Sequence, residues 1–110
     1  STARARALNA PMRAPLIIVV VARLSDHLKA PKSEQRLSAG CAAQAILLAC
    51  ESLGYAGIWR TGDAAFDRQV MTELGLSETE EVTGFLYVGT RDGEPKKIPA
   101  LAPEHFVSFW

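Results

Sequence analysis

The segment from Ala39 to Cys50 constrains the fold most, because it reads AGCAAQAILLAC and carries a single polar side chain, Gln44. We expect a helix from about Ser33 to Leu53, in which Ser33 is the N-cap and Gly54 ends the helix. A helix that is apolar on every side is buried on every side. The fold must therefore cover this helix all round.

The rest of the chain supplies few partners for such a helix. A lone chain of 110 residues buries only about two-thirds of its unfolded surface. Gly40 costs about 1 kcal/mol in mid-helix relative to alanine, so a neighbouring group is expected to need the space. The final aromatic residues, Phe106, Phe109 and Trp110, also lack evident partners. These features predict oligomerisation, a longer parent protein, or both.

Three segments are expected to be strands. The run from Pro15 to Ala22 is apolar and largely β-branched, which is typical of a central strand covered on both faces. Tyr55 to Trp59 is a short strand, and the segment 80–90, EEVTGFLYVGT, is a longer one. Within it, Gly84 marks a close approach of another group.

A second helix is expected after Asp63, which can cap it. Phe66, Val70 and Leu74 repeat at helical spacing, and Gly75 follows as the stop. The segment from Ser1 to Asn9 is rich in alanine and arginine and is expected to be the end of another helix.

Charge and composition exclude several classes of protein. Twelve basic and twelve acidic residues cancel, so no large basic field is available for nucleic acid. The longest apolar run is far shorter than the ~20 residues of a membrane helix, and no signal-peptide pattern is present. We therefore expect a cytoplasmic protein. Cys41 and Cys50 point to opposite faces of one helix and are expected to be reduced core residues.

The common catalytic motifs are missing from the sequence. His27 and His105 lie far apart and match no metal-ligand spacing, so both are expected to be solvated loop residues. There is no GxSxG elbow, and the segment 89–97, GTRDGEPKK, matches neither a Walker A loop nor a dinucleotide fingerprint. No catalytic side chain and no metal site are predicted.

The segment from Gly54 to Asp63, GYAGIWRTGD, has two interpretations. In the first, it is a strand end and turn, with Trp59 in the core and Arg60 reaching solvent. In the second, it lines a site for an aromatic cofactor, which needs a flat apolar wall, backbone N–H donors and glycine for close contact.

Three segments resemble, in order and spacing, the small YdjA-like subgroup of the nitroreductase family, whose members are FMN-dependent NAD(P)H oxidoreductases. They are NAPMRAPLIIVVVA, SAGCAAQAILLACESLGYAGIWRTG and GFLYVGT. The similarity extends over residues 1–110, which would form the C-terminal portion of one nitroreductase-like domain.

The resemblance implies an α+β fold with a mainly antiparallel sheet flanked by helices. It also implies a homodimer, with a long central helix at the interface and a C-terminal segment that extends over the partner. FMN would bind at that interface. Electrons would pass from NAD(P)H through flavin N5 to a nitroaromatic, quinone or enone acceptor in a ping-pong cycle.

Site residues follow from the resemblance by position. Those expected along the flavin are Trp59, Arg60, Thr61 and Gly62, and the backbone N–H groups of Thr61 and Gly62 are candidates for the N5 contact. Those expected at the pyridine nucleotide are Ala49, Cys50, Glu51, Ser52, Leu53 and Gly54. Lys96 or Lys97 could reach the flavin phosphate, although a solvated loop is the more conservative interpretation.

The chain departs from the family in one respect. The Arg-Arg-Ser type motif that holds the FMN phosphate in the family does not occur in these residues. We therefore expect a fragment that cannot hold FMN alone with normal affinity. Two alternatives stay open: a non-catalytic nitroreductase-like module that binds flavin or dimerises, and an unrelated α/β interaction domain in which GIWRTG is only a turn.

Overall fold

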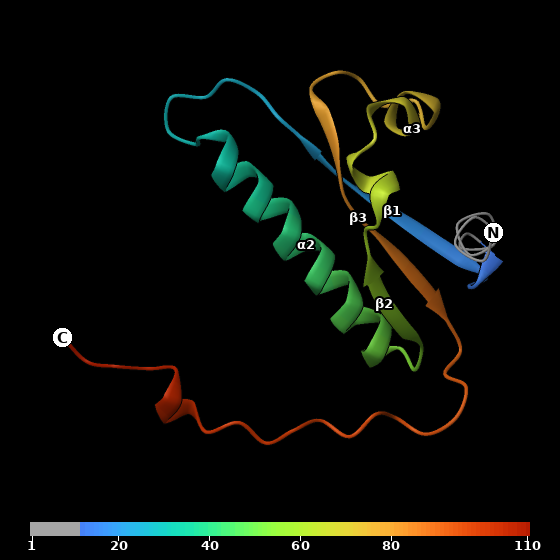
Figure 1. The fold of residues 1–110 in the computed structure, drawn as a ribbon, viewed down its shortest axis with the longest axis vertical. Helices are drawn as coiled ribbons and strands as arrows, with labels where there is room; N and C mark the ends of the chain where they lie inside the picture. The colour runs from blue at the N-terminus through green and yellow to red at the C-terminus, as the bar shows by residue number, and fades with distance from the viewer. Residues whose placement is uncertain (1–11) are drawn as a thin grey trace.

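The computed structural model describes residues 12–110, and it shows a three-stranded antiparallel sheet with helices (Figure 1). The strands, in spatial order, are β1 (Leu16–Arg23), β3 (Glu80–Gly89) and β2 (Ala56–Arg60). The helices are α2 (Lys32–Ser52) and α3 (Arg68–Glu73), with short 3₁₀ turns η2 (Asp63–Phe66) and η3 (Pro103–His105). The expected α+β fold with an antiparallel sheet is confirmed. The helix end expected at Ser1–Asn9 lies outside the described residues.

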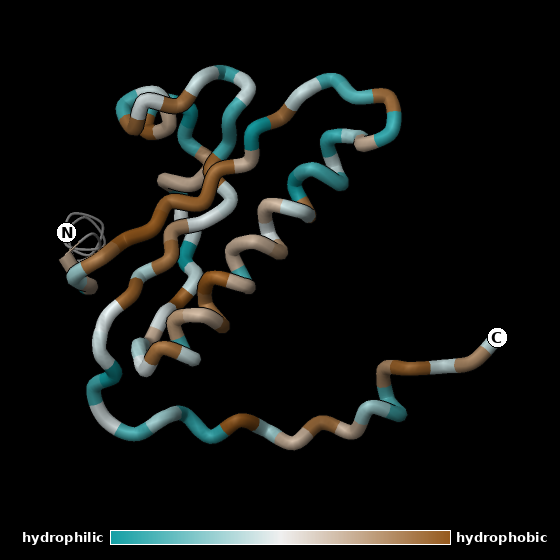
Figure 2. The backbone as a smooth tube through the Cα atoms, turned by 180° about the vertical axis from the view of Figure 1, so that it is seen from behind, coloured by the Kyte–Doolittle hydropathy of each residue, from teal (hydrophilic) through white to brown (hydrophobic). Residues whose placement is uncertain are grey.

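The strand β1 is at an edge of this sheet, so its predicted central position is wrong for the described part of the chain. It pairs with β3 alone, from Leu16 opposite Val88 to Arg23 opposite Glu80. Figure 2 shows the continuous hydrophobic run along it. Such a run indicates that both faces of a strand favour burial, but it does not say which strands lie beside it.

The helix α2 packs against one face of the sheet and buries only one side of itself. Ala43 is fully buried against Val20, Leu86 and Val88. On the opposite side of the helix, Leu37 and Leu48 are 69% and 62% exposed. The predicted burial on every side is therefore not achieved within one chain.

Both cysteines of α2 are free, as expected, but only one belongs to the core. Cys50 is half-buried and packs against the core cluster, whereas Cys41 is exposed. The expectation of a core position was wrong for Cys41, because only one side of α2 meets the sheet.

The two ends of α2 differ in how well the sequence predicts them. Gly54 has φ 85°, and the Tyr55 amide donates to the Cys50 carbonyl at 2.9 Å. These are the marks of the glycine stop that was predicted. At the other end the predicted cap was wrong, because Pro31 is the N-cap and Ser33 lies inside the helix.

The second helix begins later than predicted. Asp67 caps α3 and accepts a hydrogen bond from the Gln69 amide at 2.8 Å, whereas Asp63 begins the separate turn η2. Phe66 therefore lies outside α3 and is 79% exposed. Gly75, with φ 84°, ends the helix as expected.

A bulge in β3 changes the face that its side chains occupy. The register passes from Val20 opposite Gly84 to Val21 opposite Val82, so Thr83 is the extra residue. As a result, Val82 packs with η2 and α3, on the face away from α2. Its neighbour Glu81 instead turns toward α2, where Arg36 Nε donates to its Oε1 at 3.0 Å.

The C-terminal segment leaves the sheet after β3 and runs away from the body of the molecule (Figure 1). Phe109 and Trp110 are fully exposed, and Lys96 and Lys97 lie in an exposed loop as predicted. The radius of gyration is 17.0 Å, whereas a compact domain of this length has about 13 Å. The single chain is therefore more extended than an ordinary domain.

Two features are absent from the described residues. Among residues 12–110, no helix combines the length and the apolar character that crossing a lipid bilayer requires. Nor, in the same part of the chain, do three or more His, Cys, Asp or Glu side chains gather closely enough to hold a metal ion. His27 and His105 are both exposed, as expected.

Candidate functional site

The side chain of Trp59 lies between two glycines, one on the sheet and one on α2. A Cβ placed on Gly84 would lie 2.6 Å from Trp59 Cδ1 and 2.9 Å from Cε2. A Cβ placed on Gly40 would lie 3.7 Å from Trp59 Cη2. The close approach predicted at Gly84 is confirmed, and the indole ring is the neighbour. The prediction that a neighbour needs the space at Gly40 was wrong, because a Cβ there would meet the ring at an ordinary contact distance.

Successive residues of β2 point to opposite faces of the sheet. Trp59 points toward α2, as does Gly57, where a Cβ would meet Leu47 of α2. Ile58 pairs with Tyr87 and Arg60 with Phe85 on the outer face, away from α2. Trp59 packs on the α2 side of the sheet but is still 36% exposed and belongs to neither core cluster, so the core position of the first interpretation is not reached in this chain. Arg60 points to the opposite face.

The outer face carries an apolar cavity of about 560 Å³ at the end of β2. Its volume lies within the ~300–1,000 Å³ typical of ligand sites. The strand residues that line it are Ile17, Val19, Phe85 and Tyr87, and the others are Thr61, Gly62, Asp63, Ala64, Val70 and Leu74. Two of the four residues predicted to face a flavin, Thr61 and Gly62, thus lie together at its rim.

The backbone of Gly62 is accessible at the rim of this cavity. Its φ of 64° and ψ of −171° belong to a conformation that L-residues with side chains rarely adopt. A Cβ at this position would meet no atom within 4 Å, so the space beside it is open. An apolar wall beside an accessible glycine backbone fits the needs of a flat aromatic cofactor such as the isoalloxazine ring of FMN.

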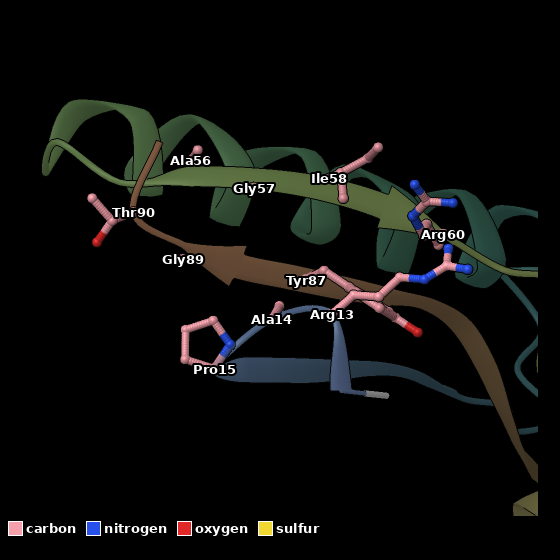
Figure 3. A pocket seen from close by; sticks show the side chains of 10 residues that line it. All are labelled: Arg13, Ala14, Pro15, Ala56, Gly57, Ile58, Arg60, Tyr87, Gly89 and Thr90. Atoms are coloured by element: carbon pink, nitrogen blue, oxygen red, sulfur yellow. The ribbon is translucent and has the colours of Figure 1, made fainter. Parts of the chain in front are cut away.

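A second cavity of about 330 Å³ lies beside the first on the outer face, with Tyr87 lining both. Figure 3 shows the side chains of Arg13 and Arg60 reaching the same end of it. Pro15, Ala56 and Ile58 are among the residues that form its apolar part. Arg60 therefore lines a different cavity from Thr61 and Gly62.

The predicted pyridine-nucleotide segment, Ala49 to Gly54, lies at the other end of β2. Glu51 accepts a hydrogen bond there from Arg91 Nη2 at 2.9 Å. The five residues of β2 separate this segment from Gly62 by ~17 Å, at ~3.4 Å per residue. The Ala49–Gly54 segment accordingly does not line the cavity beside Gly62.

Sequence reasoning missed the outer-face residues that complete these cavities: Arg13, Ile17, Val19, Phe85 and Tyr87. The two-residue periodicity of β1 and β3 could have found the strand residues among them, because Ile17, Val19, Phe85 and Tyr87 each alternate with residues that face α2. No comparable signal existed for Arg13, since it precedes β1.

Residues 2–90 match the family model described as the nitroreductase family. Over 106 residues, the chain is 46% identical to the Escherichia coli strain K12 protein named "Putative NAD(P)H nitroreductase YdjA", and the match covers 96% of this chain and 58% of that protein. A similarly named protein of Haemophilus influenzae is 34% identical over 106 residues, with 94% of this chain and 58% of the relative covered. The chain thus spans little more than half the length of these relatives.

The fold has a solved counterpart in a nitroreductase-like family protein from Bacillus cereus. The two structures agree with a TM-score of 0.76 at 17% sequence identity, over 96% of this chain and 59% of the other. This likeness supports the fold, and the family match over residues 2–90 supports the descent. The chain therefore belongs to the nitroreductase family.

Proposed function

We propose that this chain is the C-terminal portion of an FMN-dependent NAD(P)H oxidoreductase that reduces nitroaromatic or quinone-type acceptors in a ping-pong cycle. One observation carries the proposal: the open backbone of Gly62 beside an apolar cavity, in a chain of this family. FMN, when bound, would supply hydride chemistry between the nicotinamide and the acceptor. The protein would supply the binding surface, the orientation and the exclusion of water.

The residues at the end of β2 would divide this work among themselves. Thr61 and Gly62 would offer backbone N–H groups and a surface without a side chain at the rim of the cavity. Trp59 would hold the end of β2 through its packing against Gly84 and Gly40. No side-chain acid or base is assigned to the hydride step.

A homodimer is part of the proposal, and the exposed surface supports it. The chain exposes 9119 Å², whereas a compact monomer of this mass exposes roughly 6,000 Å². Two chains together therefore carry an excess of roughly 6,000 Å², which is more than enough to supply the about 2,000–5,000 Å² that obligate dimers bury in total.

The Ala49–Gly54 segment is retained as a proposed contact of NAD(P)H away from the reacting ring. The cytoplasmic location is retained with it. Both cysteines are free thiols, which is compatible with a reducing compartment.

The full-length protein tests this function directly. It should purify yellow, with the absorbance spectrum of oxidised flavin, and anaerobic addition of NADH or NADPH should bleach that spectrum. Adding a nitroaromatic or a quinone should restore the colour. Bound flavin that neither nucleotide bleaches would support the non-catalytic module instead, and the absence of flavin would refute the proposed function.

A further inference from the structure

The loop between β1 and α2, residues 24–31, is held by one side chain of α2. Gln35 Oε1 accepts a hydrogen bond from the Ser25 amide at 3.0 Å, and Gln35 Nε2 donates to the Ser25 carbonyl at 2.9 Å. The same Nε2 donates to the Ala30 carbonyl at 2.7 Å. A primary amide carries two N–H donors and one carbonyl acceptor, so the loop uses all the donors of Gln35. This side chain thereby joins both ends of the loop to α2.

In the described part of the chain, little else attaches the middle of this loop. Lys32 Nζ lies 3.5 Å from Asp26 Oδ1, and the Asp26 side chain is fully exposed. An ion pair in such a position contributes little to stability, because water and salt screen it. Leu28 is also fully exposed, so no burial of its side chain fixes the loop. The position of residues 25–30 therefore depends mainly on Gln35.

The two flanks of the loop are anchored by other groups. Leu24 is buried, and its amide donates to the Thr79 carbonyl at 2.9 Å. The Pro31 carbonyl accepts a hydrogen bond from the Glu34 amide at 2.9 Å, at the start of α2. The segment 25–30 between these anchors can consequently move without breaking the hydrogen bonds of the sheet or of the helix.

We propose that Gln35 is the latch of a strap formed by residues 25–30, which opens as one unit while the sheet and α2 stay folded. Such local opening is expected where a segment has few buried apolar contacts and is held by exposed hydrogen bonds. Opening would move Leu28, the exposed apolar residue of the strap, relative to the sheet. The strap lines neither of the outer-face cavities, so the latch does not rest on the proposed function.

Hydrogen exchange of the full-length protein, followed at single amides by NMR, tests the latch. In Gln35→Ala, the Ser25 amide should exchange about tenfold faster or more, because three hydrogen bonds to the strap are lost together. The Lys29 amide donates to His27 Nδ1 at 3.1 Å and should quicken as well, although its acceptor is not Gln35. The Leu24 amide, which is bonded outside the strap, should keep its wild-type rate.

Two further variants separate the amide donors from the shape of the side chain and from the helix itself. Gln35→Glu keeps the shape and an acceptor but loses the N–H donors, since an ionised carboxylate only accepts. Its Ser25 and Lys29 amides should therefore also exchange faster than in wild type. Gln44→Ala removes an exposed glutamine from the same helix and should leave all three rates unchanged.

The pattern of rates decides the outcome. Faster exchange at Ser25 with an unchanged rate at Lys29 would indicate one local hydrogen bond and would overturn the strap. Wild-type rates in Gln35→Glu would overturn the role of the amide donors. An equal rise at Leu24 would contradict an opening confined to residues 25–30. A protein without flavin or turnover would refute the proposed function, and its exchange rates would still test the latch.

Discussion

Replacing Gly84 by alanine should destabilise the protein, because the new methyl group would enter the space of the Trp59 ring. The added Cβ would lie 2.6 Å from Trp59 Cδ1 and nearer still to Nε1. Carbon atoms in contact prefer about 3.5–4.0 Å, so the ring must move by about 1 Å. Gly40 of α2 lies on the far side of that ring, where a Cβ would be 3.7 Å from Cη2.

The cost follows from two opposing effects. Overpacking a well-filled core typically costs about 1–3 kcal/mol. Replacing glycine by alanine also restricts the unfolded chain, which returns about 0.4–1 kcal/mol. We expect a net loss of about 1–2 kcal/mol in the free energy of unfolding. Urea denaturation of the full-length protein at one fixed protein concentration, followed by circular dichroism, measures it.

Two further variants make the reasoning refutable. Gly40→Ala should keep the stability or raise it by up to about 1 kcal/mol, since its Cβ meets the ring at an ordinary distance and alanine favours the helix. Combining Trp59→Phe with Gly84→Ala should cost less than the sum of the single changes, because the smaller ring leaves room for the methyl group. A Gly84→Ala protein as stable as wild type, or strictly additive costs of the two changes, would refute the conclusion that the Trp59 ring fills the space beside Gly84.

Three other changes have defined outcomes. Gly62→Ala should lower the ratio of bound flavin to protein, measured by absorbance, because φ 64° disfavours a Cβ by roughly 1–2 kcal/mol; an unchanged ratio would contradict the role of this backbone. The Ser77 amide donates to Glu80 Oε1 at 3.0 Å and lowers the Glu80 pKa below its ordinary 4.5. Ionised Glu80 therefore stabilises the fold above that value, and this contribution is lost as the pH falls through the lowered pKa. Glu80→Gln should consequently be less stable than wild type at neutral pH, with a difference that shrinks in urea titrations as the pH falls below 4.5, and a constant difference would count against the bond. The 110-residue chain alone should hold FMN in less than stoichiometric amount, and stoichiometric flavin in a preparation verified by mass spectrometry would disprove that expectation.

Local signals in the sequence predicted the elements that local chemistry determines. Gly54 and Gly75 end their helices because each adopts a positive φ, which glycine tolerates. The segment 80–90 alternates as a strand should, and Gly84 indicated a close neighbour without identifying it. These predictions needed only residues within one turn or one strand.

The wrong predictions concern choices that depend on distant or competing groups. The position of β1 depends on which strand reaches it, and its apolar run carries no information on that partner. Asp63 and Asp67 can both cap a helix, and the helical spacing of Phe66, Val70 and Leu74 suits either start. Gly62 has a positive φ and leads into the separate turn η2 at Asp63. Asp67 is therefore the residue that caps α3.

The division of roles within the Trp59–Gly62 stretch follows from strand geometry. Neighbouring residues of β2 point to opposite faces, so Trp59 and Arg60 cannot both present side chains to one flat ligand. Trp59 uses its ring on the α2 side, against Gly84, and only the residues beyond the strand expose backbone to the outer cavity. Trp59 would therefore affect a cofactor on the outer face only indirectly, by fixing the position of the end of β2. Substituting Trp59 should then shift Thr61 and Gly62 together, which makes the indole a positioning group for the site.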